Sequence, residues 1–160
     1  MNKKVLLMVH AAMIAALYVV LTFIANALGL ANYAVQVRFS EALTILPYFT
    51  PAAIPGLFIG CLLSNILTGC AIPDIIFGSL ATLAGAFFTY KLRRYRWLAP
   101  VPPIITNMIV VPLVLLYAYG IRPLWFSFVT VTAGEIISCG ILGMILLFTL
   151  EKYKDRIFRL

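Results

Sequence analysis

Charged side chains are scarce in this sequence. They make up 11% of the 160 residues, against about a quarter in a typical soluble domain. Hydrophobic residues make up 64%, and the mean hydropathy is +1.08. A soluble fold of this composition would expose a large apolar exterior, which monomeric soluble proteins avoid. The composition therefore excludes an ordinary soluble domain and predicts an integral membrane protein.

Residues for catalysis and metal binding are also few. The chain has one histidine, His10, and three cysteines in apolar stretches, Cys61, Cys70 and Cys139. An odd number of cysteines without paired spacing indicates neither a disulfide framework nor a metal site. We interpret them as small core residues and expect no metal and no cofactor. No GxxxxGK[ST], HExxH or GxSxG motif is present, so we expect a protein that neither splits ATP in the P-loop manner nor acts as an enzyme.

The net charge of +7 does not indicate a nucleic-acid partner, because the bases gather at the ends of apolar runs. With both termini in the cytoplasm, only Arg38 and Arg122 lie outside, and ten bases lie inside, as the positive-inside rule requires. The ten are Lys3, Lys4, Lys91, Arg93, Arg94, Arg96, Lys152, Lys154, Arg156 and Arg159. The apolar stretch after Lys4 is too long for a cleaved signal peptide, so we expect a retained first helix.

The apolar runs predict an all-α bundle of six transmembrane helices in one membrane domain over residues 1–160. At about 20 residues per span, the chain has no room for a separate domain outside the membrane. The helices are expected at about 4–28, 40–50, 53–68, 74–92, 102–119 and 124–150. The second is short because prolines follow closely. The even number of spans requires it to cross the membrane or nearly so.

Three acids lie in the outer half or near the middle of this topology: Glu41, Asp74 and Glu135. Glu135 is the deepest, about 16 Å from the outer end of the last helix. A carboxylate at that depth is costly unless it faces a cavity or a partner, so it predicts a functional site. The alternatives are an ion pair with Arg38 or an interhelical hydrogen bond. Glu41 and Asp74 also fit the role of helix caps.

We expect these acids to converge with other polar and aromatic side chains on one outward-facing pocket. Three acids and one base favour a ligand with hydrogen-bond donors or a positive charge. The aromatic members offer stacking faces, although Trp is enriched at membrane interfaces in any case. The amide in the fifth helix also fits an interhelical hydrogen bond. The candidate binding residues are Arg38, Glu41, Asn65, Asp74, Phe77, Asn107, Trp125 and Glu135.

The first helix carries a stripe of small residues, Ala11, Ala12, Ala15 and Ala16, at the spacing that allows close helix approach. Gly56 and Gly60 form a second pair of this kind in residues 53–68. Docking of a partner helix and packing within the bundle both fit such a stripe.

Three segments resemble the QueT family of queuosine-precursor uptake proteins: residues 37–44 (VRFSEALT), 49–57 (FTPAAIPGL) and 74–83 (DIIFGSLATL). The resemblance implies a substrate-binding S component of an energy-coupling factor (ECF) transporter, multi-pass in the bacterial cytoplasmic membrane. Such proteins capture a micronutrient outside and dock on a membrane scaffold protein that carries two ATPase subunits. It also implies that the alanine stripe is the docking surface and that residues 32–38 close over the substrate.

The implied ligands are 7-deazaguanines: preQ1, preQ0 or queuine. A guanine edge presents adjacent N–H donors that one carboxylate accepts bidentately, and the aminomethyl cation of preQ1 requires a second carboxylate. We expect Asp74 and Glu135 to fill these two roles. Donation to O6 is expected from Asn65, Asn107 or Arg38, and stacking from Phe77 or Trp125. The alternative function is a stand-alone secondary transporter in which Glu135 or Asp74 carries a coupling proton.

Overall fold

The computed structural model describes residues 2–30 and 37–158, and every regular element in these ranges is helical. The α-helices are α1 (Lys3–Ala27), α2 (Ala53–Leu67), α3 (Ser79–Lys91), α4 (Val101–Tyr119), α5 (Leu124–Glu135), α6 (Gly143–Glu151) and α7 (Lys154–Ile157). Two 3₁₀ helices, η1 (Phe39–Tyr48) and η3 (Arg96–Leu98), and two π-helical segments, η2 (Asp74–Gly78) and η4 (Ile136–Leu142), complete them.

The helix ends follow local signals in the sequence. The Asn2 side chain accepts a hydrogen bond from the Lys4 backbone N–H at 3.1 Å and caps the start of α1. Gly29 and Gly120 adopt positive φ just after α1 and α4, the usual way to end a helix. The six expected ranges lie within two residues of helical segments in the structure. The additional helices are η3, between the fourth and fifth expected ranges, and α7, after the sixth.

The last long helix is continuous but not uniform. Helices α5 and α6 are joined by η4, a π-helical segment that begins directly after Glu135. The segment η2 likewise begins at Asp74 and runs into α3. One π-helical segment therefore begins at an acid of the predicted site, and the other begins directly after one. Segments of π-helix are frequent at functional sites.

Among the described residues, three segments are long and apolar enough to cross a membrane: Lys3–Ala27, Arg96–Tyr119 and Leu124–Glu151. Helix α2 is apolar but shorter. Large apolar side chains also face outward, among them Met8, Ile72 and Tyr117. An all-helical chain with such an exterior is a membrane helical protein, as the composition predicts.

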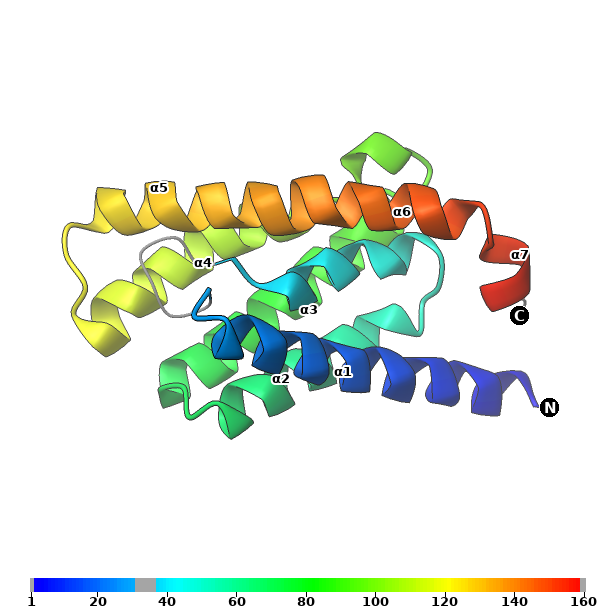
Figure 1. Cartoon of the computed structure of the whole chain (residues 1–160), viewed down its shortest axis with the longest axis horizontal. Helices are drawn as coiled ribbons and strands as arrows, with labels where there is room; N and C mark the ends of the chain where they lie inside the picture. Colours follow the sequence, from blue (N-terminus) through cyan, green and yellow to red (C-terminus); the bar gives the residue numbers. More distant parts are fainter. Residues whose placement is uncertain (1, 31–36, 159–160) are drawn as a thin grey trace.

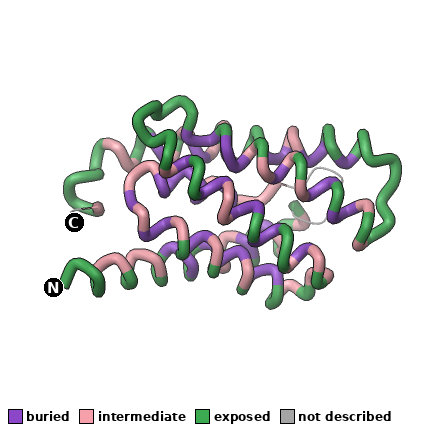
Figure 2. Tube along the Cα trace, turned by 180° about the vertical axis from the view of Figure 1, so that it is seen from behind, coloured by how far each residue is buried: buried purple, intermediate pink, exposed green. Residues whose placement is uncertain are grey.

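The helices run along one long axis, and the segment from α5 to α6 lies on the opposite side of the bundle from α1 (Figure 1). Between them lies η1, which contacts α1, α2, α3, η4 and α6. Seven of its ten residues are buried, and the purple buried positions in Figure 2 line the faces that the helices turn toward one another. The apolar core around η1 includes Ile14, Ile45 and Leu147.

Helices α1 and α2 approach each other closely. A Cβ atom on Gly56 would lie 2.7 Å from the carbonyl oxygen of Ala11, and one on Gly60 would lie 3.1 Å from the Cα of Ala15. Only glycine fits at such distances. Ala15 is therefore buried and Ala11 half-buried against α2, whereas Ala12 and Ala16 are exposed; Ala11, Ala12 and Ala15 still line one outer groove together. The stripe expected on the first helix thus extends from the contact with α2 to the exposed side of α1, and its docking role stays a prediction.

The two ends of the bundle differ. We call the end where α1 and α4 finish and α5 begins the ligand end, and the opposite end, which holds both chain termini, the basic end (Figure 1).

Candidate ligand-binding site

The carboxylate of Glu41, on η1, is only 2% exposed and is held by hydrogen bonds from two other helices. The Tyr18 hydroxyl of α1 donates to Oε1 at 2.5 Å, and the Asn107 amide of α4 donates to Oε2 at 3.3 Å. An ionised carboxylate has about four acceptor positions. Each oxygen of Glu41 is thus fixed in place and still has capacity for another donor.

Glu135, the last residue of α5, contributes a second buried carboxylate, which is 7% exposed. Its Oε2 accepts a hydrogen bond from the Cys139 thiol, one turn further along the helix, at 3.2 Å. That thiol also lies 3.4 Å from the backbone oxygen of Glu41 and 3.3 Å from the Thr44 hydroxyl. A thiol is a weak donor, so Glu135 is less firmly paired than Glu41.

Glu41, Glu135 and Cys139 place ligand atoms within 4.8 Å of one another. Among the described residues, these three side chains form a group whose ligand atoms are close enough to share a metal ion. The same closeness suits an organic ligand with several N–H donors, since both carboxylates can then accept from one small molecule.

The two acids line a small cavity together with seven other residues, which come from several helices of the bundle. Its lining residues are Arg38, Glu41, Cys61, Gly78, Thr82, Asn107, Val111, Val131 and Glu135. The cavity has a volume of about 10 Å³, which is about the space that one water molecule needs. A bicyclic base therefore fits only after side chains around the cavity move apart.

Four of the eight predicted binding residues thus meet at one cavity: Arg38, Glu41, Asn107 and Glu135. The suggested ion pair between Arg38 and Glu135 is absent, since the ion pair found among residues 2–30 and 37–158 joins Arg96 to Glu151. The rest of the loop expected to cover the substrate, residues 32–36, lies outside the described residues.

Asp74 and Asn65 lie directly behind the cavity wall at Gly78. A Cβ on Gly78 would lie 3.2 Å from Asp74 Oδ1 and 3.4 Å from Asn65 Nδ2. The Asp74 carboxylate accepts a hydrogen bond from the Tyr119 hydroxyl at 3.4 Å, and the Asn65 amide donates to the Asp74 backbone oxygen at 3.4 Å. Both are buried, and they border the cavity without lining it.

Phe77 and Trp125 do not line the cavity. Phe77 is 53% exposed and lines an outer apolar groove with Leu113 and Tyr117. It precedes the cavity residue Gly78, and adjacent helix residues do not share a face. Trp125 is 68% exposed, and its ring meets the edge of the neighbouring Phe126 ring. Neither ring therefore lines the cavity, and the stacking role of both residues stays a prediction.

Sequence reasoning missed several residues of the site, above all Tyr18 and Cys139. Cys139 is buried, as expected of a core residue, but it also hydrogen-bonds to Glu135. The spacing of four residues between them on one helix was a signal for this contact. Tyr18 lies at helical spacing from Ala11 and Ala15, so its burial could have been predicted from the periodicity of α1. Its hydrogen bond to Glu41 could not have been predicted in this way.

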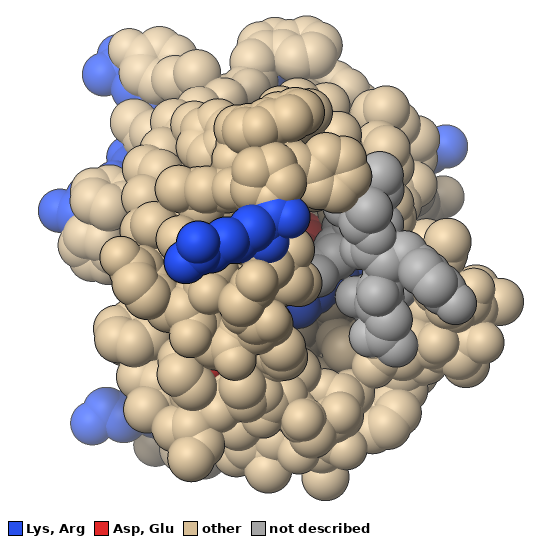
Figure 3. Space-filling view, turned by 90° about the vertical axis from the view of Figure 1, so that its left-hand side faces the viewer, with Lys and Arg blue, Asp and Glu red and all other residues tan. Residues whose placement is uncertain are grey.

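Figure 3 shows the ligand end in space-filling form. The surface is mostly neutral, and Asp and Glu atoms barely reach it, in agreement with the burial of Glu41, Asp74 and Glu135. The acids of this end therefore act inside the bundle.

Comparison with known proteins identifies the family. The model of the QueT transporter family matches residues 8–152. A stretch of 72 residues is 38% identical to the queuosine precursor transporter QueT of Lactococcus lactis subsp. cremoris, and this stretch covers 45% of the present chain and 42% of that protein. The match thus spans less than half the length of the curated relative, and no solved structure matches the chain. With nearly its whole length matched by the family model, the chain belongs to the QueT transporter family.

Proposed function

We propose that this protein is the substrate-binding S component of an ECF-type importer that captures a queuosine precursor outside and delivers it to the cytoplasm. The observation that carries the proposal is the cavity formed by two buried carboxylates in a chain of the QueT transporter family. The chain has no P-loop motif, so the proposal assigns ATP hydrolysis to partner subunits and no catalysis to this one.

The proposed topology has six spans, with both termini in the cytoplasm of a bacterial cell. The spans are α1, η1, α2, η2 with α3, α4, and the continuous segment from α5 to α6. The gathering of exposed bases at the end that holds both termini supports this orientation. In this arrangement the ligand end faces outward, and the carboxylate cavity lies on the side from which the substrate arrives.

The proposed ligand is a 7-deazaguanine such as preQ1 or queuine, in keeping with the name of the Lactococcus relative. The carboxylate of Glu41, already oriented by Tyr18 and Asn107, is suited to accept the adjacent N–H donors of the guanine edge. Glu135 accepts a hydrogen bond from the Cys139 thiol, a weak donor, and is suited to the aminomethyl cation of preQ1. This assignment moves the guanine-edge role from Asp74, which is engaged by Tyr119 behind Gly78, to Glu41.

Arg38 is the remaining charged residue of the cavity, and we assign to it the donation to O6 of the base. Asn107 is less suited to that role because its amide already donates to Glu41. Asn65 and Asp74 then shape the cavity from behind Gly78.

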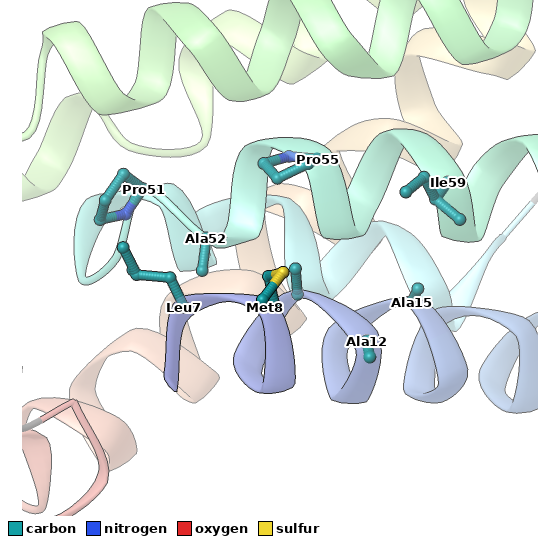
Figure 4. Close-up of a pocket in the computed structure, with 9 residues that line it drawn as sticks. Leu7, Met8, Ala12, Ala15, Pro51, Ala52, Pro55 and Ile59 are labelled. Carbon is teal, nitrogen blue, oxygen red and sulfur yellow. The ribbon is translucent and has the colours of Figure 1, made fainter. Parts of the chain in front are cut away.

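The proposed partner is the ECF coupling module, a transmembrane scaffold protein with two ATPase subunits; no nucleic acid is involved. Docking is assigned to the exposed side of α1. An apolar groove of about 520 Å³ lies there between α1 and the start of α2, and its lining includes Ala12, Pro51 and Ile59 (Figure 4). Small residues beside an apolar groove let a partner helix approach closely.

Uptake by reconstituted protein tests the proposal. Liposomes that contain this chain, the scaffold and both ATPases should accumulate labelled preQ1 only when ATP is supplied. Liposomes that contain the chain alone should bind preQ1 without accumulating it.

The second candidate function, a proton-coupled transporter, is favoured by the two adjacent buried carboxylates, since an intramembrane acid can carry a proton. Uptake by the chain alone, driven by a proton gradient, would establish that function and refute the S-component proposal.

A further inference from the structure

A second, quite different pocket lies at the basic end. It is formed where the end of η1, the segment after α3 and helix α7 meet, and it has a volume of about 470 Å³. Its lining residues are Tyr48, Phe49, Arg93, Arg94, Lys154, Asp155 and Phe158. Basic and aromatic side chains predominate, and none of these residues lines the carboxylate cavity.

This basic pocket has an excess of positive charge. Three bases face one acid, and Arg93, Arg94 and Lys154 are all exposed. The ion pair among the described residues is Arg96 with Glu151, so no described carboxylate lies within 4 Å of the three bases. The Arg93 guanidinium lies over the Tyr90 ring, 4.3 Å from its centroid, which holds it at the edge of the pocket. The pocket is thus suited to an anion.

An apolar groove of about 190 Å³ adjoins the basic pocket and shares Phe158 with it. Residues of α1, η1, α6 and α7 line this groove, among them Met13, Leu46 and Leu146. The Phe158 ring stacks on Phe49 at 5.0 Å and meets His10 edge-on at 6.3 Å, so it forms the wall between the two hollows. His10 Nδ1 is buried, without a hydrogen-bond partner among the described residues.

We propose that the basic pocket and the apolar groove together bind one anionic phospholipid from the leaflet at the basic end. Its phosphate contacts Arg93, Arg94 and Lys154, and an acyl chain lies in the groove past Phe158. Basic pockets between membrane helices bind anionic head groups in this way. The adjoining groove favours a lipid over a soluble phosphate, because a soluble anion makes no use of an apolar surface. The site does not depend on the transported ligand.

Native mass spectrometry of the full-length protein, released from detergent micelles, tests the proposal. Phosphatidylglycerol is compared with phosphatidylcholine of the same acyl chains. The variant Arg93→Gln/Arg94→Gln/Lys154→Gln is compared with Lys3→Gln/Lys4→Gln/Lys152→Gln, which removes the same charge from the same end outside the pocket. Wild type and control should retain phosphatidylglycerol preferentially. The pocket variant should lose about fivefold in affinity per charge removed.

Two further outcomes would overturn the proposal. Equal loss in both triple variants would show that diffuse positive charge, rather than this pocket, attracts the lipid. Displacement of phosphatidylglycerol by an equal concentration of glycerol phosphate would show a site for soluble anions, because the lipid's acyl chain would then add nothing. Thermal unfolding of each variant in the same detergent checks that the exposed substitutions leave the fold intact.

Discussion

The two ends of the bundle use charge in opposite ways. At the ligand end Glu41, Asp74 and Glu135 are each less than 10% exposed, and every one has a hydrogen-bond donor. At the basic end Arg93, Arg94 and their neighbours are exposed. A buried charge is tolerated only where its partners are fixed, whereas an exposed one needs no particular partner. The ligand end is therefore suited to recognising one molecule, and the basic end to setting orientation and contacting lipid or protein surfaces.

The most direct test of the difference between the two ends determines which end faces the outside of the cell. The largest effect is expected here, because each cysteine should be either labelled or not labelled on intact cells. Single cysteines replace Arg122 at the ligand end or Lys152 at the basic end, with Cys70→Ser to remove the partly exposed native thiol. A membrane-impermeant maleimide should label the Arg122→Cys protein on intact cells, because we place that end outside. It should label the Lys152→Cys protein only after permeabilisation; the reverse pattern would invert the topology.

The next largest effect is expected on uptake. Ala12→Trp/Ala16→Trp places bulk on the exposed side of α1, so the coupling module should no longer approach, and uptake should fall to background. Binding of preQ1 to the purified chain should be unchanged, because neither residue lines the carboxylate cavity. Ile24→Trp, an exposed position on another side of α1, is the matched control. Normal uptake by the double variant would remove the docking role from α1.

A smaller effect is expected on affinity at the ligand end. Glu135→Gln replaces a charged acceptor by a neutral amide and should weaken preQ1 binding about 10- to 100-fold by calorimetry, as expected for a hydrogen bond to a charged group. Glu41→Gln should weaken it to a similar extent. Glu151→Gln removes an acid from the basic end and should have no effect. Unchanged affinity in both cavity variants would show that the ligand binds elsewhere.

The smallest effect concerns Tyr18, which donates a hydrogen bond to Glu41 and does not line the cavity. Tyr18→Phe removes one donor of about 1 kcal/mol and should weaken binding about fivefold. Uptake measured at saturating ligand should stay normal, because docking surfaces are untouched. Tyr117→Phe, at an exposed hydroxyl, is the control. A loss as large as that of Glu41→Gln would mean that Tyr18 contacts the ligand itself.

Much of the helical layout was predictable from the sequence, because apolar runs, prolines and glycines are local signals. The meeting of Glu41 with Glu135 was predictable in outline, since intramembrane acids turn toward one another or toward a cavity. Which alanines of the first helix are buried was not predictable, because it depends on how α1 is rotated against Gly56 and Gly60.

The position of Phe77 outside the cavity lining could not be read from the sequence for a related reason. A π-helical segment at residues 74–78 sets which side of the helix faces inward, and it brings Gly78 rather than Phe77 to the cavity. Rotations of this kind arise from packing between helices. No periodicity in the sequence of one helix encodes them.

The buried position of η1 has a consequence for how the protein fits its bilayer. Ten residues in 3₁₀ geometry rise about 20 Å, against about 15 Å in an α-helix, and the hydrocarbon core is about 30 Å thick. A lipid-facing segment of this length would force the bilayer to thin. Because neighbouring helices enclose η1, it meets protein instead of acyl chains and is released from the requirement to match membrane thickness. That freedom is what lets this short segment include Ser40, Glu41, Thr44 and Pro47 in the middle of a membrane protein.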